Sequence, residues 1–459
     1  MLSSWPLIAA IALSVGTVAV SVPSNATVVR EAQEVLDRLI RPQDPGAAVL
    51  IARGKQVIFK KARGRAETEL DVPLSLDHTF RIASVTKIFT AASILKLAEA
   101  GTLSLDDSLA RYFPHMPDAG RITIRQLLNH TAGISDRASQ AQAGSARRES
   151  ERAARLADIL ERPLNFAPGT SWSYSNAGYI LLGAVIETVT GEPWHAVLQK
   201  QFFQPLRMTH TRYGDMSTLI PGRAAGYTTD SRSREVRRVE FVSATVPDSA
   251  GALVSTADDL LCWMRALTSG RAIGRESFRQ MITPVQTVSA SPASERYGLG
   301  VYVWQVRGET MIGHTGQIPG FAAVVGYLPQ HDITIIALAN VDSFDARLVG
   351  RRLAAIAVGK PYHEVVPAKA SDSELRELAG SYRIDEQTVR RLLVKDGTLY
   401  SQRGDRNPIP LQVTADHAFH FDPDELTYFV PVRDAAGRIV GLDYYQDGEG
   451  PPQRLPRIG

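Results

Sequence analysis

The sequence predicts an α/β (α+β) domain, an antiparallel sheet flanked by helices with a helical subdomain beside it, followed by a C-terminal all-β antiparallel barrel. Two apolar stretches, residues 81–101 and 178–190, have the composition of buried helices. From Tyr297 onward, β-rich runs are joined by short connections, which is typical of an antiparallel sheet. Beyond residue 374 the runs become short and evenly spaced, which predicts the barrel.

The first 26 residues resemble an export signal. The apolar run PLIAAIALSVGTVAV has the length of a signal peptide and is short for a membrane span. Ser24-Asn25-Ala26 offers small residues at a cleavage site, but no Lys or Arg precedes the run, so the segment could instead remain as an N-terminal anchor. We therefore expect an exported bacterial protein, periplasmic or secreted. Its one cysteine, Cys262, cannot form an intrachain disulfide.

The rest of the chain divides by composition into a main domain, a linker and the barrel. The main domain is predicted over residues 27–358 and includes a hairpin at Gly54-Lys55. Residues 359–373 contain two prolines and separate it from residues 374–459. In this last segment, short β-like runs alternate with turn signals such as Asp396-Gly397.

The stretch RIASVTKIFTAASILKLAEAG, residues 81–101, carries the first chemical signal. Ser84 stands at the start of the predicted helix and Lys87 lies one turn later, since three residues advance about 300° and about 4.5 Å. A buried lysine loses its proton more easily, so its neutral amine could accept the serine proton. Backbone N–H groups at the helix start favour developing negative charge.

An S-x-x-K pattern alone is weak evidence, because the same helix contains a second copy from Ser93 to Lys96. Ser93 lies nine residues after Ser84, about 180° around the helix axis, so the two serines face opposite ways. Ser93 lies in mid-helix, away from free N–H groups, and we interpret it as a packed serine.

Two further motifs occur later in the chain. Tyr174-Ser175-Asn176 directly precedes the second apolar helix, and the ordinary interpretation of its tyrosine is a bridge between surface and core. His314-Thr315-Gly316-Gln317 lies between two predicted strands, where an isolated histidine is more often a satisfied core group. The glycines there allow close backbone approach to a ligand. The polar segment 136–156 is either an exposed loop running into a surface helix or a flap over the site.

In order and spacing, the three motifs resemble those of the penicillin-recognising serine hydrolases. The sequence is similar to the class C β-lactamase-like family, which includes D-alanyl-D-alanine carboxypeptidases, D-aminopeptidases and esterases. The resemblance covers about residues 33–358 and includes the stretches TIRQLLNHTAGI and AGALVSTADDL. It implies a serine β-lactamase-like fold, and the barrel resembles the lipocalin-like domain appended to some members.

The resemblance also implies a role for each motif residue. Ser84 would be the acylated nucleophile, while Lys87 and Tyr174 would share general-base and general-acid work. Asn176 would bind the substrate amide and help position Lys87. The backbone N–H groups of Ser84 and Gln317 would form the oxyanion hole. His314 and Thr315, which precede Gly316, would contact the carboxylate end of the substrate.

His314 is a departure, because β-lactamases of this class carry lysine there. Its presence weakens the fixed positive charge for a β-lactam carboxylate and is compatible with D-peptidases and esterases. The expected function is therefore an exported serine hydrolase acting through an acyl-enzyme on D-amino-acid peptides, esters or related amides. The alternatives are a true β-lactamase and a noncatalytic penicillin-binding sensor or scaffold on the same fold.

Composition and motifs bound the expected partners. Lys and Arg outnumber Asp and Glu by only 51 to 48, so nucleic-acid binding has no support. The expected partner is a small-molecule or peptide substrate, and no membrane contact is implied beyond the possible N-terminal anchor. No metal site and no organic cofactor is implied. The sequence specifies no oligomeric state. The barrel would either pack or contact another copy, or would restrict access to the Ser84 cleft.

Overall fold

The computed structural model describes residues 23–136, 152–215, 217–230, 235–285, 295–362, 365–415, 417–421 and 426–458. Most of the predicted signal segment, residues 1–22, therefore lies outside the described residues. At its end, Ser24 caps the first helix, α1 (Asn25–Leu39), by accepting a hydrogen bond from the Thr27 N–H. Most of the predicted loop or flap also lies outside them, and Arg152 begins α4.

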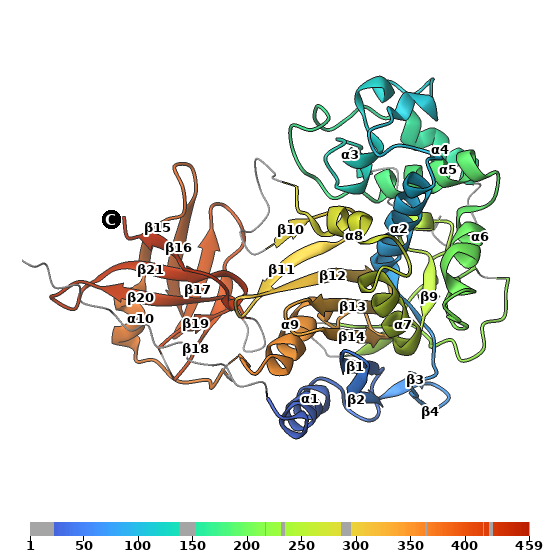
Figure 1. The fold of residues 1–459 in the computed structure, drawn as a ribbon. Helices are drawn as coiled ribbons and strands as arrows, with labels where there is room; N and C mark the ends of the chain where they lie inside the picture. The colour runs from blue at the N-terminus through green and yellow to red at the C-terminus, as the bar shows by residue number, and fades with distance from the viewer. Residues whose placement is uncertain are drawn as a thin grey trace, which may run out of the picture.

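A seven-stranded antiparallel sheet organises the main domain, in the order β10-β11-β12-β13-β14-β1-β2 (Figure 1). Its strands are β1 (Ala47–Arg53), β2 (Gln56–Arg63), β10 (Glu295–Tyr297), β11 (Tyr302–Val306), β12 (Glu309–Ile318), β13 (Phe321–Leu328) and β14 (Ile333–Ala339). The hairpin predicted at Gly54-Lys55 is confirmed by the pairing of β1 with β2. The third motif lies within β12 rather than between two strands, because β12 pairs with β13 as far as Ile318.

Helices cover both faces of this sheet. Alternate side chains of β1 accordingly pack into two different cores. Ala48 and Leu50 contribute to the core that contains α2 (Thr86–Glu99), whereas Val49 and Ile51 contribute to the core beneath α1 and α9. The other helices are α3 (Ile124–Leu128), α4 (Arg152–Glu161), α5 (Asn176–Thr190), α6 (Trp194–Leu198), α7 (Ala257–Thr268), α8 (Arg275–Ile282) and α9 (Ala346–Ala357).

Short strands complete the main domain. They are β3 (Arg65–Glu67), β4 (Val72–Pro73), β5 (Phe80–Arg81), β6 (Arg212–Tyr213), β7 (Tyr227–Thr229), β8 (Val236–Arg238) and β9 (Leu253–Ser255). Strand β9 pairs with both β5 and β6, and this small sheet anchors the chain that leads into α2. In the described ranges, no helix combines the length and apolar character needed to cross a membrane.

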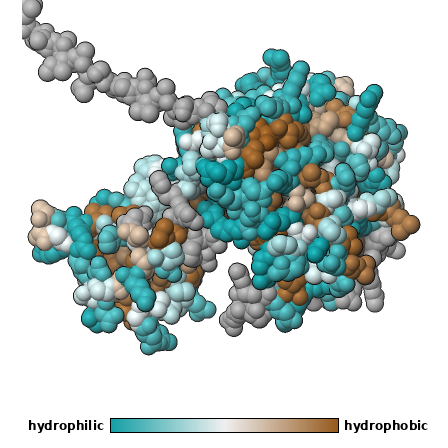
Figure 2. All heavy atoms as spheres, turned by 90° about the horizontal axis from the view of Figure 1, so that it is seen from below, coloured by the Kyte–Doolittle hydropathy of each residue, from teal (hydrophilic) through white to brown (hydrophobic). Residues whose placement is uncertain are grey.

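The predicted C-terminal barrel is confirmed as eight antiparallel strands in sequence order that nearly close on themselves. They are β15 (Gly380–Arg383), β16 (Val389–Lys395), β17 (Thr398–Arg403), β18 (Ile409–Val413), β19 (Phe419–His420), β20 (Tyr428–Arg433), β21 (Ile439–Tyr445) and β22 (Gln453–Pro456), with α10 (Asp372–Leu378) beside them. A bridge between Tyr382 and Arg457 joins the first strand to the end of the last. Figure 2 shows the barrel as a smaller lobe beside the main domain.

The barrel docks on the main domain through two acidic residues. The Glu449 carboxylate accepts hydrogen bonds of 2.8 Å from the Arg307 N–H, in the turn between β11 and β12. Asp447 pairs with Arg347 and with the buried Arg351 of α9. From Arg307 to His314 the strand advances about 24 Å, at about 3.4 Å per residue. These contacts therefore lie away from the third motif, which favours a packing role over a role in restricting the cleft.

Candidate active site

Ser84 lies in a tight turn against which strand β12 of the seven-stranded sheet packs. The 3-10 turn η1 (Ala83–Val85) runs directly into α2, and Ser84 is half-exposed between buried neighbours. Ala83 has φ of +45°, a left-handed conformation that costs energy for a residue with a Cβ. Gly316 packs against this turn, since a Cβ on it would lie 2.2 Å from the Ile82 carbonyl oxygen. The glycine is thus needed for contact with the protein's own backbone.

Lys87 is fully buried and directed at Ser84. Its Nζ lies 3.1 Å from Ser84 Oγ, 2.8 Å from Asn176 Oδ1 and 2.9 Å from the Ala250 carbonyl oxygen. The last two groups can only accept hydrogen bonds, whereas a serine hydroxyl can also donate. A neutral amine would give its two protons to Asn176 and Ala250 and direct its lone pair at the Ser84 hydroxyl. The contacts of Lys87 therefore suit a base.

Burial lowers the pKa of Lys87 to about 7, and the Asp136 carboxylate acts in the opposite direction. Burial works this way because an ammonium ion loses more hydration than an amine when it leaves water. Near neutral pH a substantial fraction of the protein therefore carries the amine.

Tyr174 is a second hydrogen-bonding neighbour of the Ser84 hydroxyl. Its ring is 4.8 Å from Lys87 Nζ. Burial and the neighbouring Tyr302 raise the pKa of Tyr174 well above its usual value, and the bond to Ser84 opposes this only in part. Tyr174 is accordingly a neutral phenol at physiological pH and is suited to donating a proton.

The loop that carries Tyr174 is held on both sides by His130, which motif analysis alone did not single out. The His130 carbonyl accepts from the Ser173 N–H at 3.1 Å, and its Nδ1 accepts from the Ser175 N–H at 3.2 Å. The ring centroids of His130 and Tyr174 are 4.5 Å apart. Burial and the charge of Lys87 lower the pKa of His130 well below its usual value, so it remains a neutral acceptor. Its place in the stretch NHTAG was the available signal.

Asp136 is a second residue that the sequence did not reveal. It accepts hydrogen bonds from the N–H groups of Asn176 at 2.6 Å and Ala177 at 3.0 Å, at the start of α5. Its other oxygen lies 3.2 Å from Asn176 Nδ2. Because an amide has one acceptor and one donor end, this contact orients the Asn176 oxygen toward Lys87. No local sequence pattern around Asp136 predicts this role.

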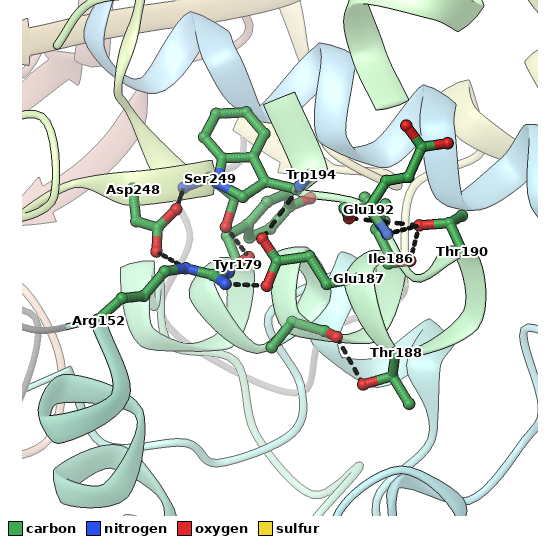
Figure 3. Close-up of polar contacts among 11 residues, drawn as sticks. Arg152, Tyr179, Ile186, Glu187, Thr188, Thr190, Glu192, Trp194, Asp248 and Ser249 are labelled. Carbon is green, nitrogen blue, oxygen red and sulfur yellow. Dashed lines mark hydrogen bonds and ion pairs between the residues drawn. The ribbon is translucent and has the colours of Figure 1, made fainter. Parts of the chain in front are cut away.

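A charged network holds the turn that contains Ala250, and Figure 3 shows its Arg152, Asp248 and Glu187 side chains. Ala250 belongs to the 3-10 turn η6 (Asp248–Ala250), in which the buried Asp248 has φ of +42° and accepts from the Ser249 N–H at 2.8 Å. Arg152 Nε donates to Asp248 at 2.5 Å, and its Nη1 donates to Glu187. Ser249 in turn donates to the Tyr179 carbonyl at 2.9 Å. Through Asp248, Arg152 thus stabilises η6, the turn whose Ala250 carbonyl contacts Lys87.

His314 lies near Lys87 but has no free donor for a ligand. Its Nε2 is 3.0 Å from the Tyr297 hydroxyl, and its Nδ1 contacts the Thr315 carbonyl, which can only accept. Nδ1 therefore carries the proton and Nε2 accepts one from Tyr297. Burial and the charge of Lys87 lower the pKa of His314 to about 3. The predicted contact of this side chain with a substrate carboxylate does not fit these bonds, because both nitrogens are already engaged.

The other members of the third motif face the site differently. Thr315 is half-exposed, while Gln317 is exposed and donates through its side chain to the Asp342 carbonyl at 2.9 Å.

In the second S-x-x-K copy, the serine and the lysine are not brought together as Ser84 and Lys87 are. Ser93 is buried and donates to Gln201 at 2.8 Å, and Lys96 donates to the Ala272 carbonyl at 3.1 Å.

The described residues contain no group of three or more His, Cys, Asp or Glu side chains arranged to hold a metal ion. The chemistry that the arrangement itself supports is acyl transfer. It combines a hydroxyl, a buried amine and a neutral phenol within one site.

Comparison with known proteins gives the same assignment. A family model described as Beta-lactamase matches residues 29–359. Penicillin-binding protein 4* of Bacillus subtilis is 28% identical over 399 residues, which are 80% of this chain and 86% of that protein. Protein flp of Staphylococcus aureus (strain COL) is 29% identical over 324 residues and 68% of this chain, which spans only 64% of flp.

Solved structures agree with this match. A D-stereospecific amidohydrolase from Streptomyces sp. is 28% identical with a TM-score of 0.60, covering 70% of this chain and 95% of that one. The octameric penicillin-binding protein homologue from Pyrococcus abyssi has a TM-score of 0.68 at 22% identity, covering 94% of this chain and 99% of that one. The second comparison concerns the fold alone, and its coverage extends over the barrel.

The buried Lys87 predicts a pH-dependent stability. Since its pKa is about 7 in the folded protein and about 10.4 in an unfolded chain, only the unfolded state holds the proton between these values. Stability should therefore rise with pH across this window, by up to about 1.4 kcal/mol per pH unit. We expect the free energy of unfolding of the wild type, measured by urea denaturation relative to Lys87→Met, to show this slope. Parallel curves for the two proteins would contradict a depressed lysine pKa.

The Arg152 network predicts that Asp248 positions Lys87. Asp248→Asn should loosen η6 and lower kcat by roughly 10- to 100-fold, the usual cost of a small misplacement of a reacting group. Water admitted beside Lys87 should also move the acid limb of the kcat/KM profile to higher pH. Glu187→Gln is the matched control, because Glu187 shares Arg152 but bonds the Trp194 N–H instead of η6. Equal effects of the two changes on the pH profile would exclude a specific role for Asp248.

Proposed function

The chain belongs to the beta-lactamase family and is a serine hydrolase, and on that premise we propose that it cleaves amides or esters of D-amino acids that have a neutral leaving group. The observation that carries this proposal is His314, buried and neutral at the position where β-lactamases of this type carry a lysine. A neutral amide or ester needs no fixed cation there, whereas a β-lactam brings a carboxylate that does. The D-stereospecific amidohydrolase from Streptomyces, similar over 70% of this chain, supports the choice of substrate class.

In the proposed mechanism, Ser84 attacks the acyl carbonyl while the Lys87 amine takes its proton. The lowered pKa of Lys87 and its two fixed acceptors support its role as the base. The N–H groups of Ser84 and Gln317 would bind the oxyanion that develops. Tyr174, a neutral phenol hydrogen-bonded to Ser84, would donate a proton to the leaving amine or alkoxide.

Hydrolysis of the acyl-enzyme would reverse these proton transfers. A water molecule in the place of the leaving group would lose a proton to the same pair of residues. Asn176 would keep Lys87 in place and offer its remaining amide proton to the substrate carbonyl, because its other proton is directed at Asp136. Thr315, half-exposed next to His314, would contact the leaving-group side of the substrate.

We propose further that the protein is exported, with its signal within residues 1–26, and acts in the periplasm or outside the cell. The apolar run and the small residues after it support this location. The noncatalytic sensor is the weaker alternative, since Ser84, Lys87 and Tyr174 are all present and in mutual contact. A true β-lactamase is disfavoured by the missing cation.

The proposal predicts a substrate preference. D-phenylalanine amide should be turned over at least about tenfold faster in kcat/KM than the L-amide, within the range that pocket contacts supply. Nitrocefin should be hydrolysed slowly relative to 4-nitrophenyl butyrate. His314→Lys should shift the nitrocefin-to-butyrate ratio of kcat/KM upward by roughly tenfold, because a charge-assisted hydrogen bond exceeds a neutral one by about that factor.

The control for this substitution is the same ratio in Ser93→Ala, which lies in the same domain and outside the site. If the wild type hydrolyses nitrocefin as fast as the ester, or shows no preference between D- and L-amides, the proposed substrate class is wrong. An unchanged ratio in His314→Lys would show that this position does not set specificity.

A further inference from the structure

A cavity of about 390 Å³ opens beside the turn that follows the third motif. It lies between this turn, at Pro319, and the segment around Phe241. Its walls include Glu67, Arg81, Arg223, Arg238, Glu240 and Phe241. Three of these wall residues are arginines, and they differ in how their charges are balanced.

Two of these arginines, Arg81 and Arg223, differ from Arg238 in their hydrogen bonds and ion pairs. Arg81 is only 3% exposed, and its Nη1 donates a 2.7 Å hydrogen bond to the Val242 carbonyl. Arg223 donates from Nη1 to the Asp215 carbonyl at 3.3 Å. Nη2 of each is buried without a hydrogen-bond partner, and among the described residues neither guanidinium forms an ion pair within 4.0 Å.

The two guanidinium groups also share one aromatic ring. Each lies 5.1 Å from the centroid of Phe241, which offers partial compensation through cation–π attraction. Burial and the neighbouring charge of Arg223 lower the pKa of Arg81 to about 10. Burying a charge without a partner is costly, and burying two like charges close together is more so. An anion from outside the chain would relieve both costs.

The other charged groups of the wall do not supply that anion. Arg238 forms ion pairs with Glu67 and Glu69, and Glu67 also accepts from the Tyr227 hydroxyl. Glu240 is exposed to solvent. Arg238 is therefore balanced by two carboxylates, whereas Arg81 has no such partner and Arg223 has only the electrostatic effect of Asp215, which raises the Arg223 pKa.

The cavity lies within reach of the nucleophile, on a defined side. Arg81 precedes Ser84 by three residues, a span of at most about 11 Å. Thr315 lies in β12 before Gln317, whereas Pro319 lies in the turn that follows β12, so the two residues are on opposite sides of Gln317 along the chain. If Thr315 contacts the leaving-group side and Gln317 binds the oxyanion, the Pro319 side receives the acyl portion of the substrate.

We propose that Arg81 and Arg223, stacked on Phe241, form a subsite for a carboxylate on the acyl portion of the substrate. The assignment of the acyl side rests on the proposed function; the anion subsite itself rests on the two unpartnered guanidinium groups. Planar guanidinium groups bind carboxylates through paired hydrogen bonds, and the unused Nη2 atoms provide the donors. The substrate class is thereby narrowed to acyl groups with a terminal carboxylate a few carbons from the scissile carbonyl.

The test is a binding measurement that needs no turnover. Adipic acid monoamide and hexanamide, which have the same chain length and differ in the terminal carboxylate, would be titrated calorimetrically into full-length Ser84→Ala. We expect the acid to bind at least about tenfold more tightly than the amide. Adding Arg223→Gln should abolish this difference, and Arg223→Lys should retain part of it.

Arg238→Gln is the matched control, because Arg238 lines the same cavity but is paired with Glu67 and Glu69. It should leave the difference intact. Equal binding of the two ligands, no binding of either, or an equal loss on Arg223→Gln and on Arg238→Gln would overturn the subsite. Failure of wild-type enzyme to cleave D-amino-acid amides would instead remove the proposed function, and would leave this binding result standing.

Discussion

The burial of one amine beside one hydroxyl is the constraint on which the rest of this site depends. Lys87 can lower its pKa only if water is excluded, and it can act on Ser84 only if its other contacts are acceptors in fixed positions. Asn176 and the Ala250 carbonyl provide these positions from two different elements. The fold therefore brings α5 and η6 against α2, and Asp136 and Arg152 hold them there.

The sheet contributes through its backbone more than through its side chains. Strand β12 approaches η1 closely because residue 316 has no Cβ, and this contact brings the strand that carries Gln317 against the turn that carries Ser84. His314, the one ionisable side chain of this motif, is withdrawn into hydrogen bonds with Tyr297 and the Thr315 carbonyl. This motif thus offers no charged side chain to a ligand, and the proposed anion subsite lies instead at Arg81 and Arg223, whose Nη2 atoms have no hydrogen-bond partner.

Much of this could be predicted from sequence because the responsible signals are local. The start of α2, the Asn176 helix and the antiparallel strands follow from apolar runs, caps and turns. The roles of Asp136, of His130 and of the Arg152–Asp248 pair do not follow from local patterns, since each depends on a contact across a large sequence separation. Asp136 and His130 bind backbone N–H groups, and Arg152 binds the Asp248 side chain. The motif gives the position of His314 in the sequence, and the prediction that His314 contacts the substrate rests on that position. Which His314 nitrogen carries a proton depends on the hydrogen bond with Tyr297, a residue outside the motif.

The most direct test of the account is where a covalent serine reagent attaches. Ser84 and Ser93 lie in the same segment and each precedes a lysine by three residues, but only Ser84 is half-exposed beside a buried amine. Intact-mass spectrometry after reaction with a fluorophosphonate should show one adduct on wild type and on Ser93→Ala, and none on Ser84→Ala. An adduct that persists on Ser84→Ala would contradict the assignment of the nucleophile and the mechanism built on it.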